Sequence, residues 1–192
     1  MFGGPPRERA DAARNRSLLL AAAEGLFAER GIDHVSMDDI ARAAGVGKGT
    51  LYRRFGDKSG LGIAILDDRE RDLQDAILGG PPPLGPGASP AARLHAFADA
   101  YLSYLDRNLD LVVMSETASP GARYRTGVYA GWLWHVQLLL SAGGWERPRV
   151  LAACLLGALS ADLHRHLRAE GTPHREVEAA LHDLIDRLIG ER

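Results

Sequence analysis

Two short helical stretches joined by a glycine turn, at residues 36–55, constrain the fold of this chain more than any other feature. Ser36 is a good helix N-cap, and Asp39, three residues later, completes a pattern that resembles a capping box. Gly45 stops this first helix, and a second short helix is predicted over Lys48–Phe55. This geometry lets the second helix of such a pair enter a major groove of DNA, so the segment predicts a helix-turn-helix.

The side chains of this segment divide into an inward and an outward set. The apolar positions are expected to pack against Leu26 and Phe27 of a preceding helix: Ile40, Ala44, Val46, Leu51 and Phe55. The outward positions of the second helix carry cations, a hydroxyl and a phenol: Lys48, Thr50, Tyr52, Arg53 and Arg54. Such groups bind phosphates and base edges. Gly47 and Gly49 lack side chains, which would let a phosphate reach the backbone N–H groups at this helix N-terminus.

The remainder of the chain is predicted to be helical as well, which gives an all-α fold of about nine helices. The expected elements are a helix around Leu19–Phe27 ended by Gly31, one from Asp57 to about Leu78, one from Pro90 to about Asn108, a short element near Asp110–Ala118, helical structure over 121–142, a long helix over Pro148–Ala169 and a last one over Pro173–Ile189. The segment Gly79–Pro90 holds four glycines and five prolines and is predicted to be a loop.

Charge and apolar content narrow the class of protein. The net charge is −2, but residues 1–60 carry ten basic and eight acidic side chains, whereas residues 61–192 carry thirteen and seventeen. This mild bias would not by itself imply DNA. The longest apolar run, Val150–Leu159, is too short for a membrane span, and the start of the chain lacks the apolar region of a signal peptide. With Cys154 as the single cysteine, we expect a cytoplasmic protein without a membrane segment.

Aromatic residues concentrate in the segment 97–145, which contains eight of the twelve Phe, Tyr and Trp side chains. Such residues line apolar cavities that have a few polar groups. The alternative is that they fill an ordinary core. As a pocket wall, the segment would offer ligand contacts from Tyr101, Met114, Tyr124, Trp132 and Gln137.

Neither a metal site nor a catalytic site is expected. The histidines do not converge in the sequence: His164 and His166 are two residues apart on a helix and face different ways. No nucleophile-elbow or phosphate-loop motif is present, and Cys154 is expected to be a small core residue. The sequence thus predicts a protein that is not an enzyme and has no cofactor.

One set of residues extends the helix-turn-helix into a longer pattern. Its members are Ala22, Ala23, Leu26, Phe27, Gly31, Asp39, Ile40, Ala41, Ala44, Gly45, Val46, Gly47, Lys48, Gly49, Thr50, Leu51, Tyr52, Phe55 and Lys58. Over about residues 14–66 the chain closely resembles the tetracycline-repressor (TetR) family, and beyond them only size and helical layout agree. The resemblance implies a three-helix DNA-binding domain over about 8–56. It also implies a helical domain over about 57–192 that binds a small effector and forms a homodimer.

The resemblance also assigns residues to the DNA contact. By position these are Ser36, Gly47, Lys48, Gly49, Thr50, Tyr52, Arg53, Arg54 and Lys58, most of them as phosphate contacts. Gly47 departs from the Ser or Thr common in the family, so one side-chain contact is lost, and Arg54 replaces a frequent His.

The implied function is a ligand-responsive transcriptional regulator that binds palindromic operator DNA and is released by a small, largely apolar effector. Repression is the default and activation the alternative. Two other classes remain open: an enzyme or small-molecule carrier that uses the aromatic pocket, and a helical bundle that binds only proteins.

The dimer interface is expected at residues 148–189. The last helix carries the cleanest apolar stripe of the chain, from Val177 to Ile189. Ala153, Gly157 and Ala161 form a small-residue track that allows close approach of helices. With the family resemblance, these features predict half of a four-helix interface between two copies. Packing within the chain is the alternative.

Overall fold

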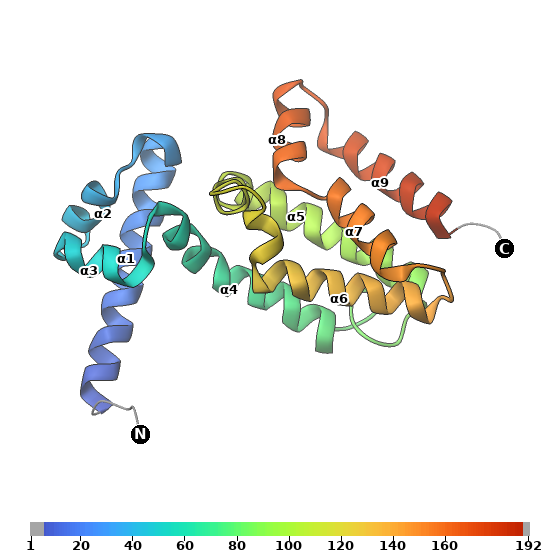
Figure 1. Cartoon of the computed structure of the whole chain (residues 1–192), viewed down its shortest axis with the longest axis horizontal. Helices are drawn as coiled ribbons and strands as arrows, with labels where there is room; N and C mark the ends of the chain where they lie inside the picture. The colour runs from blue at the N-terminus through green and yellow to red at the C-terminus, as the bar shows by residue number, and fades with distance from the viewer. Residues whose placement is uncertain (1–5, 190–192) are drawn as a thin grey trace. The chain divides into compact units, whose positions relative to one another are not determined.

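The computed structural model describes residues 6–189, with side chains from Arg14 onward except that of Asp68, and every regular element in this range is helical (Figure 1). The elements are α1 (Pro6–Arg30), η1 (Ile32–His34), α2 (Met37–Ala43), α3 (Lys48–Phe55), α4 (Lys58–Gly79), α5 (Pro90–Glu116), η2 (Ala122–Arg125), α6 (Gly127–Ala142), α7 (Pro148–Ala158), α8 (Ala161–Ala169) and α9 (His174–Ile189). The predicted all-α fold is confirmed. Within the described residues, no helix is long and apolar enough to cross a bilayer.

The chain forms two compact units that meet between Asp67 and Asp68, inside α4. The sequence placed the boundary earlier, between residues 56 and 57, where α4 begins. The physical reason for the difference is that apolar side chains in the first turns of α4 belong to the N-terminal unit and are buried: Leu61, Ile65 and Leu66. A single helix therefore belongs to both units.

The N-terminal unit has an aliphatic core. In α1, Leu19, Ala23 and Phe27 recur with the spacing of one helical face, and this face is buried. Contacts join α1 to α2 and α2 to α3, so that Ile40 and Leu51 are fully enclosed. This small bundle holds α3 at the surface.

The C-terminal unit is organised around α5, which packs against α6, α8 and α9, while α6 also packs against α7 (Figure 1). The prediction of a break after Asn108 was wrong, since α5 continues to Glu116. Asn108 is buried, donating to the Tyr104 carbonyl one turn earlier, so a poor helix former is satisfied inside the helix.

The single long helix predicted over Pro148–Ala169 is two helices, with a break at Leu159 and Ser160. The break exposes backbone groups that other elements satisfy. Arg123 donates to the Leu156 carbonyl at 2.7 Å, and Glu116 accepts from the Ala161 N–H at 3.1 Å. Because these partners come from α5 and η2, the local sequence around residue 160 could not indicate the break.

Candidate nucleic-acid interface

The start of α2 is held by a capping box. The Ser36 hydroxyl accepts from the Asp39 N–H at 3.2 Å, and the Ser36 N–H donates to the Asp39 carboxylate at 3.1 Å. The Ser36 hydroxyl also donates to this carboxylate at 2.5 Å. These bonds lower the pKa of Asp39. The predicted cap is confirmed, and in this structure the Ser36 hydroxyl is engaged within the chain.

The turn between α2 and α3 is a Schellman motif. Gly45 has φ 67°, in the left-handed region that favours glycine. Its N–H donates to the Arg42 carbonyl at 3.2 Å, and the Val46 N–H donates to the Ala41 carbonyl at 3.0 Å. The sequence predicted both the end of α2 and the start of α3 because this turn depends on its own residues.

Helix α3 buries one face and exposes the other. Leu51 is the fully buried anchor, while Val46 and Phe55 are half-buried at the two ends. All five side chains predicted to face outward are exposed: Lys48, Thr50, Tyr52, Arg53 and Arg54. The unit thus presents cations, a hydroxyl and a phenol on one short rigid helix.

The N-terminus of α3 is open. Gly47 is its N-cap and makes no side-chain capping bond. A Cβ added at Gly47 or at Gly49 would meet nothing within 4 Å, so packing within the chain does not require glycine at either position. The first backbone N–H groups of a helix lack intrahelical acceptors, and here glycines leave them accessible.

The two lysines differ in their surroundings. Lys48 is exposed and forms an ion pair with Asp38 of α2, a partner that the sequence analysis missed because a spacing of ten residues across a turn predicts no contact. The Lys58 ammonium is half-buried and donates to the carbonyls of Ile32 at 2.8 Å and Val35 at 3.2 Å. A phosphate would therefore compete with a carboxylate at Lys48 and with backbone carbonyls at Lys58.

The residues predicted to bind an effector differ in their surroundings. Tyr101 and Trp132 are buried and pack edge to face with centroids 6.1 Å apart. Met114 and Gln137 are half-buried, and Tyr124 is 66% exposed. Two cavities, one of about 250 Å³ among α5, α8 and α9 and one of about 540 Å³ between α4 and α5, are lined by residues other than these five. In this state the rings of Tyr101 and Trp132 are part of the packed core.

The predicted dimer segment divides between the interior and the surface. In α9, Leu181 and Ile185 are buried, and α9 packs against α5 of its own chain. Leu184 is 44% exposed, and Ala180, Ala153 and Gly157 are exposed too. Ala161 is buried, so the small-residue track ends at the break between α7 and α8.

Cys154 is exposed, because it lies on the outward face of α7. The prediction of a core cysteine was therefore wrong.

A buried ion pair was not anticipated. Arg123 and Glu116 pair within the C-terminal unit, and both side chains are largely buried. Burial by itself would lower the pKa of Arg123, but the hydrogen bond to Glu116 raises it. At the neighbouring Tyr101 hydroxyl, whose charged form is an anion, burial raises the pKa. An Arg that closely follows Pro120-Gly121 in the sequence can be a buried cation or a solvated one, so the sequence offered no indication.

Comparison with known proteins places this architecture in a family. Residues 19–65 match the model of bacterial regulatory proteins of the TetR family. An HTH-type transcriptional regulator from Staphylococcus aureus (strain bovine RF122 / ET3-1) is 44% identical over 69 residues, which are 36% of this chain and 36% of the relative. The match thus spans about a third of the length of such curated relatives.

Solved structures extend the likeness to the C-terminal unit. A TetR/AcrR-family transcriptional regulator from Thermobifida fusca is 29% identical, with a TM-score of 0.65 over 92% of this chain and 98% of that one. The regulator FadR from Bacillus subtilis, solved in complex with stearoyl-CoA, is 16% identical and has a TM-score of 0.65 over 91% and 97% of the two chains. The second likeness concerns the fold alone. Together with the helix-turn-helix match, these findings show that residues 19–65 carry the DNA-binding region of the TetR family of bacterial regulatory proteins, and that the whole chain is similar in fold to solved regulators of that family.

Proposed function

We propose that this chain is a transcriptional regulator that binds palindromic operator DNA as a homodimer, acts as a repressor and is released by a small, largely apolar effector. The observation that carries the proposal is the exposed face of α3, where Lys48, Thr50, Tyr52 and Arg53 project from a helix anchored by Leu51. If this face only met solvent, nothing would call for glycines at the start of α3, because packing within the chain leaves room for a side chain at Gly47 and Gly49. A helical bundle that binds only proteins is disfavoured for the same reason.

The contacts expected on DNA are those assigned by family position. Lys48 and Lys58 bind phosphates, as do the backbone N–H groups near Gly47 and Gly49. Tyr52 also binds a phosphate. Thr50, Arg53 and Arg54 offer further phosphate and base-edge contacts, with Ser36 at the start of α2. Lys48 exchanges Asp38 for a phosphate upon binding.

Dimerisation through α7 and α9 is supported by the apolar surface that the chain leaves exposed there. Val150 and Leu184 are large apolar side chains at the surface, and Ala153, Gly157 and Ala180 are small ones that permit close approach. A single helix of eight residues reads few bases. Two copies related by a dyad read a palindrome with half-sites about 34 Å apart.

The effector proposal concerns a state in which the aromatic core opens. The segment with Tyr101, Met114, Tyr124, Trp132 and Gln137 remains the proposed ligand wall, although its buried rings are closed in this structure. One regulator of similar fold was solved in complex with stearoyl-CoA, so acyl chains are the apolar ligands to test first. Such a ligand lowers DNA affinity only by the difference in its own affinity for the two states. A titration with acyl chains of increasing length should quench Trp132 or Trp134 fluorescence as DNA affinity falls.

The DNA proposal is tested with duplexes that the purified chain selects from a random pool. Enrichment of an inverted repeat is expected, and a pool with no enriched sequence would contradict the function. Lys48→Ala should weaken specific and nonspecific binding alike and flatten the log–log salt dependence by about one unit. Arg165→Ala, which removes an exposed cation on α8, is the control and should leave the slope unchanged. An unchanged slope with an altered base preference in Lys48→Ala would show a base contact instead.

The dimer is tested by sedimentation of Leu184→Arg. A charge at this position would be buried without a partner in the interface, so we expect monomers with little operator affinity. Leu138→Arg on α6 is a matched control, since Leu138 is 42% exposed and Leu184 44%. A Leu184→Arg chain that stays dimeric would place the interface elsewhere.

A further inference from the structure

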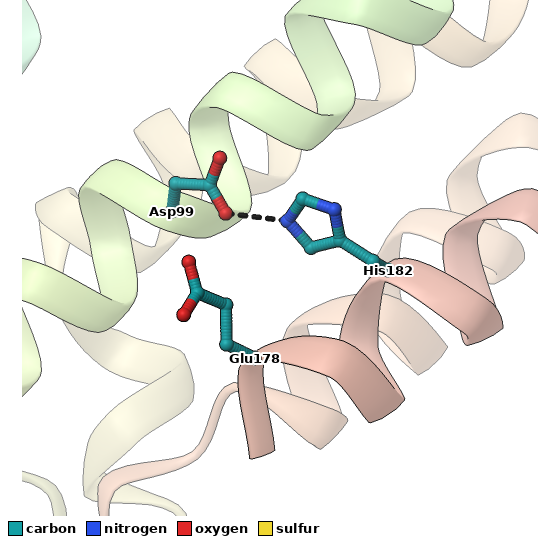
Figure 2. A group of neighbouring side chains, drawn as sticks. All are labelled: Asp99, Glu178 and His182. Atoms are coloured by element: carbon teal, nitrogen blue, oxygen red, sulfur yellow. Dashed lines mark hydrogen bonds and ion pairs between the residues drawn. The ribbon is translucent and has the colours of Figure 1, made fainter. Parts of the chain in front are cut away.

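Three side chains with metal-binding atoms meet where α9 packs against α5. Figure 2 shows Asp99 of α5 facing Glu178 and His182 of α9. Their candidate ligand atoms, two carboxylate oxygens and an imidazole nitrogen, all lie within 4.8 Å of one another. The closest pair is the His182 Nε2 atom and the Asp99 Oδ1 atom, which are 2.5 Å apart.

A second histidine and a third carboxylate adjoin this cluster. His95 lies one helical turn before Asp99, and Asp186 lies one turn after His182. The His95 Nε2 atom is 2.9 Å from Asp186, and the rings of His95 and His182 are 4.7 Å apart. The His95 Nδ1 atom is buried without a hydrogen-bond partner within the described part of the chain. Donor groups from two helices thus converge on one stretch of the α5–α9 contact.

We propose that Asp99, Glu178 and His182 bind a divalent transition-metal ion, with Zn²⁺ as its representative, and that the ion links α9 to α5. Two carboxylates balance the charge of a divalent cation, and an imidazole favours zinc, cobalt or nickel over magnesium and calcium, which prefer oxygen alone. Three protein ligands leave a coordination position for water.

The geometry requires only small side-chain adjustments. Zinc–ligand distances of about 2.0–2.2 Å place neighbouring ligand atoms about 3–3.5 Å apart. The present separations run from 2.5 Å between His182 and Asp99 to at most 4.8 Å, so the shortest has to widen and the longest to close by little more than 1 Å. Glu178 and His182 are spaced four residues apart and therefore share one face of α9.

The sequence predicted no metal site because Asp99 is about eighty residues from its partners. Glu178 and His182 alone are only a pair, and such pairs occur elsewhere on the surface: His166 and Glu170 on α8 lie 3.4 Å apart with the same spacing. The pair on α9 differs from the pair on α8 because α5 supplies it with a third ligand, Asp99. The pair on α8 therefore serves as an internal control for a site that lacks a third ligand.

The test uses the full-length, tag-free chain after treatment with a chelator, with Cys154→Ser as the background because the exposed thiol would compete for the ion. Titration with Co²⁺, followed by its visible absorption, and with Zn²⁺, followed by calorimetry, should give one ion per chain. Asp99→Asn and His182→Ala should each weaken binding at least about tenfold. His166→Ala should leave the affinity unchanged. Zn²⁺ should raise the midpoint of thermal unfolding in the background chain but not in His182→Ala.

Glu178→Gln provides a variant that removes one ligand and keeps the contact between Asp99 and His182. It too should weaken Co²⁺ binding, with unchanged helical circular dichroism. The inference is overturned if no Co²⁺ absorption appears, if Glu178→Gln binds as tightly as the background, or if His166→Ala loses as much affinity as His182→Ala. Because no DNA enters the measurement, the outcome is independent of the proposed regulation.

Discussion

The two units of this molecule differ in where they keep their polar chemistry. The N-terminal unit is apolar inside, around Leu19, Ile40 and Leu51, and carries its cations and hydroxyls on the exposed face of α3. The C-terminal unit holds polar groups within: among the described side chains, every buried polar or charged residue belongs to it. These residues are Asn108, Ser115, Arg123 and His135.

This difference explains why the family is recognised in one unit and not in the other. A helix that reads DNA must present similar groups to a duplex of nearly constant shape, so its sequence pattern recurs and residues 19–65 match the family model. A helical bundle that does not touch the duplex need only keep its packing geometry to keep its fold. Its interior can therefore differ from relative to relative, which leaves fold as the main similarity.

The largest expected effect concerns the buried ion pair. Arg123→Met leaves Glu116 buried without its partner and frees the Leu156 carbonyl, so the C-terminal unit should lose about 3–5 kcal/mol of stability. Hydrogen exchange should show lost protection in α7 and α8 but not in α2 and α3.

Two variants control for this prediction. Arg123→Met with Glu116→Gln should recover much of the loss, because the remaining side chain carries no charge. Arg168→Met breaks an exposed pair with Asp106 and should cost under about 1 kcal/mol. If Arg123→Met and Arg168→Met lowered stability equally, the buried ion pair would contribute no more than an exposed one.

The converse experiment is Leu51→Ala. Leu51 is fully buried at the centre of the N-terminal unit, so its truncation should cost about 3 kcal/mol through lost burial and a cavity. Protection should fall in α1, α2 and α3, and DNA binding should weaken. Leu18→Ala on the exposed side of α1 should have little effect. Loss of protection that spreads to α6 and α7 would mean that the two units unfold together.

Acid should act first on the C-terminal unit. Burial, aided by the positive charge of Arg93, lowers the pKa of His135 to about 4. Below the ordinary value of about 6.5 the unfolded chain binds a proton that the folded chain excludes. The stability that neutral His135 contributes is therefore fully present above pH 6.5. As the pH falls toward 4, the free energy of unfolding decreases by about 2–3 kcal/mol.

The measurement compares the free energy of unfolding of wild type and His135→Leu between pH 7 and pH 4.5. The wild type should lose stability more steeply, and the removal of a buried, unpaired Nε2 atom should make the variant no less stable at low pH. His164, whose pKa burial also lowers, contributes in the same direction in both chains. Parallel pH profiles would show that His135 is not the titrating group.

The smallest expected effect separates capping from DNA contact at Ser36. Ser36→Ala removes the acceptor for the Asp39 N–H and should destabilise the N-terminal unit by about 1 kcal/mol. Ser36→Thr keeps the hydroxyl and should restore stability. If Ser36→Ala weakens DNA binding without lowering the protection of α2, the residue acts by direct contact instead.

Local signals predicted α2 and α3 closely, because a cap at Ser36 and a left-handed Gly45 depend on their own neighbours. Signals failed where distant partners act. The break at Leu159 and Ser160 is satisfied by Glu116 and Arg123, which lie more than thirty residues away along the chain.

The sequence by itself determined the helical class, the boundaries of the helix-turn-helix and the outward residues of α3, since each follows from periodicity and turn chemistry over a few residues. Only the tertiary structure decided which apolar positions of α9 face inward, and that Asp99, Glu178 and His182 meet. An amphipathic stripe specifies that a helix packs but not against what, because many neighbours offer similar apolar burial. The packing of α9 on α5 settles the choice and brings together side chains that no spacing in the sequence relates.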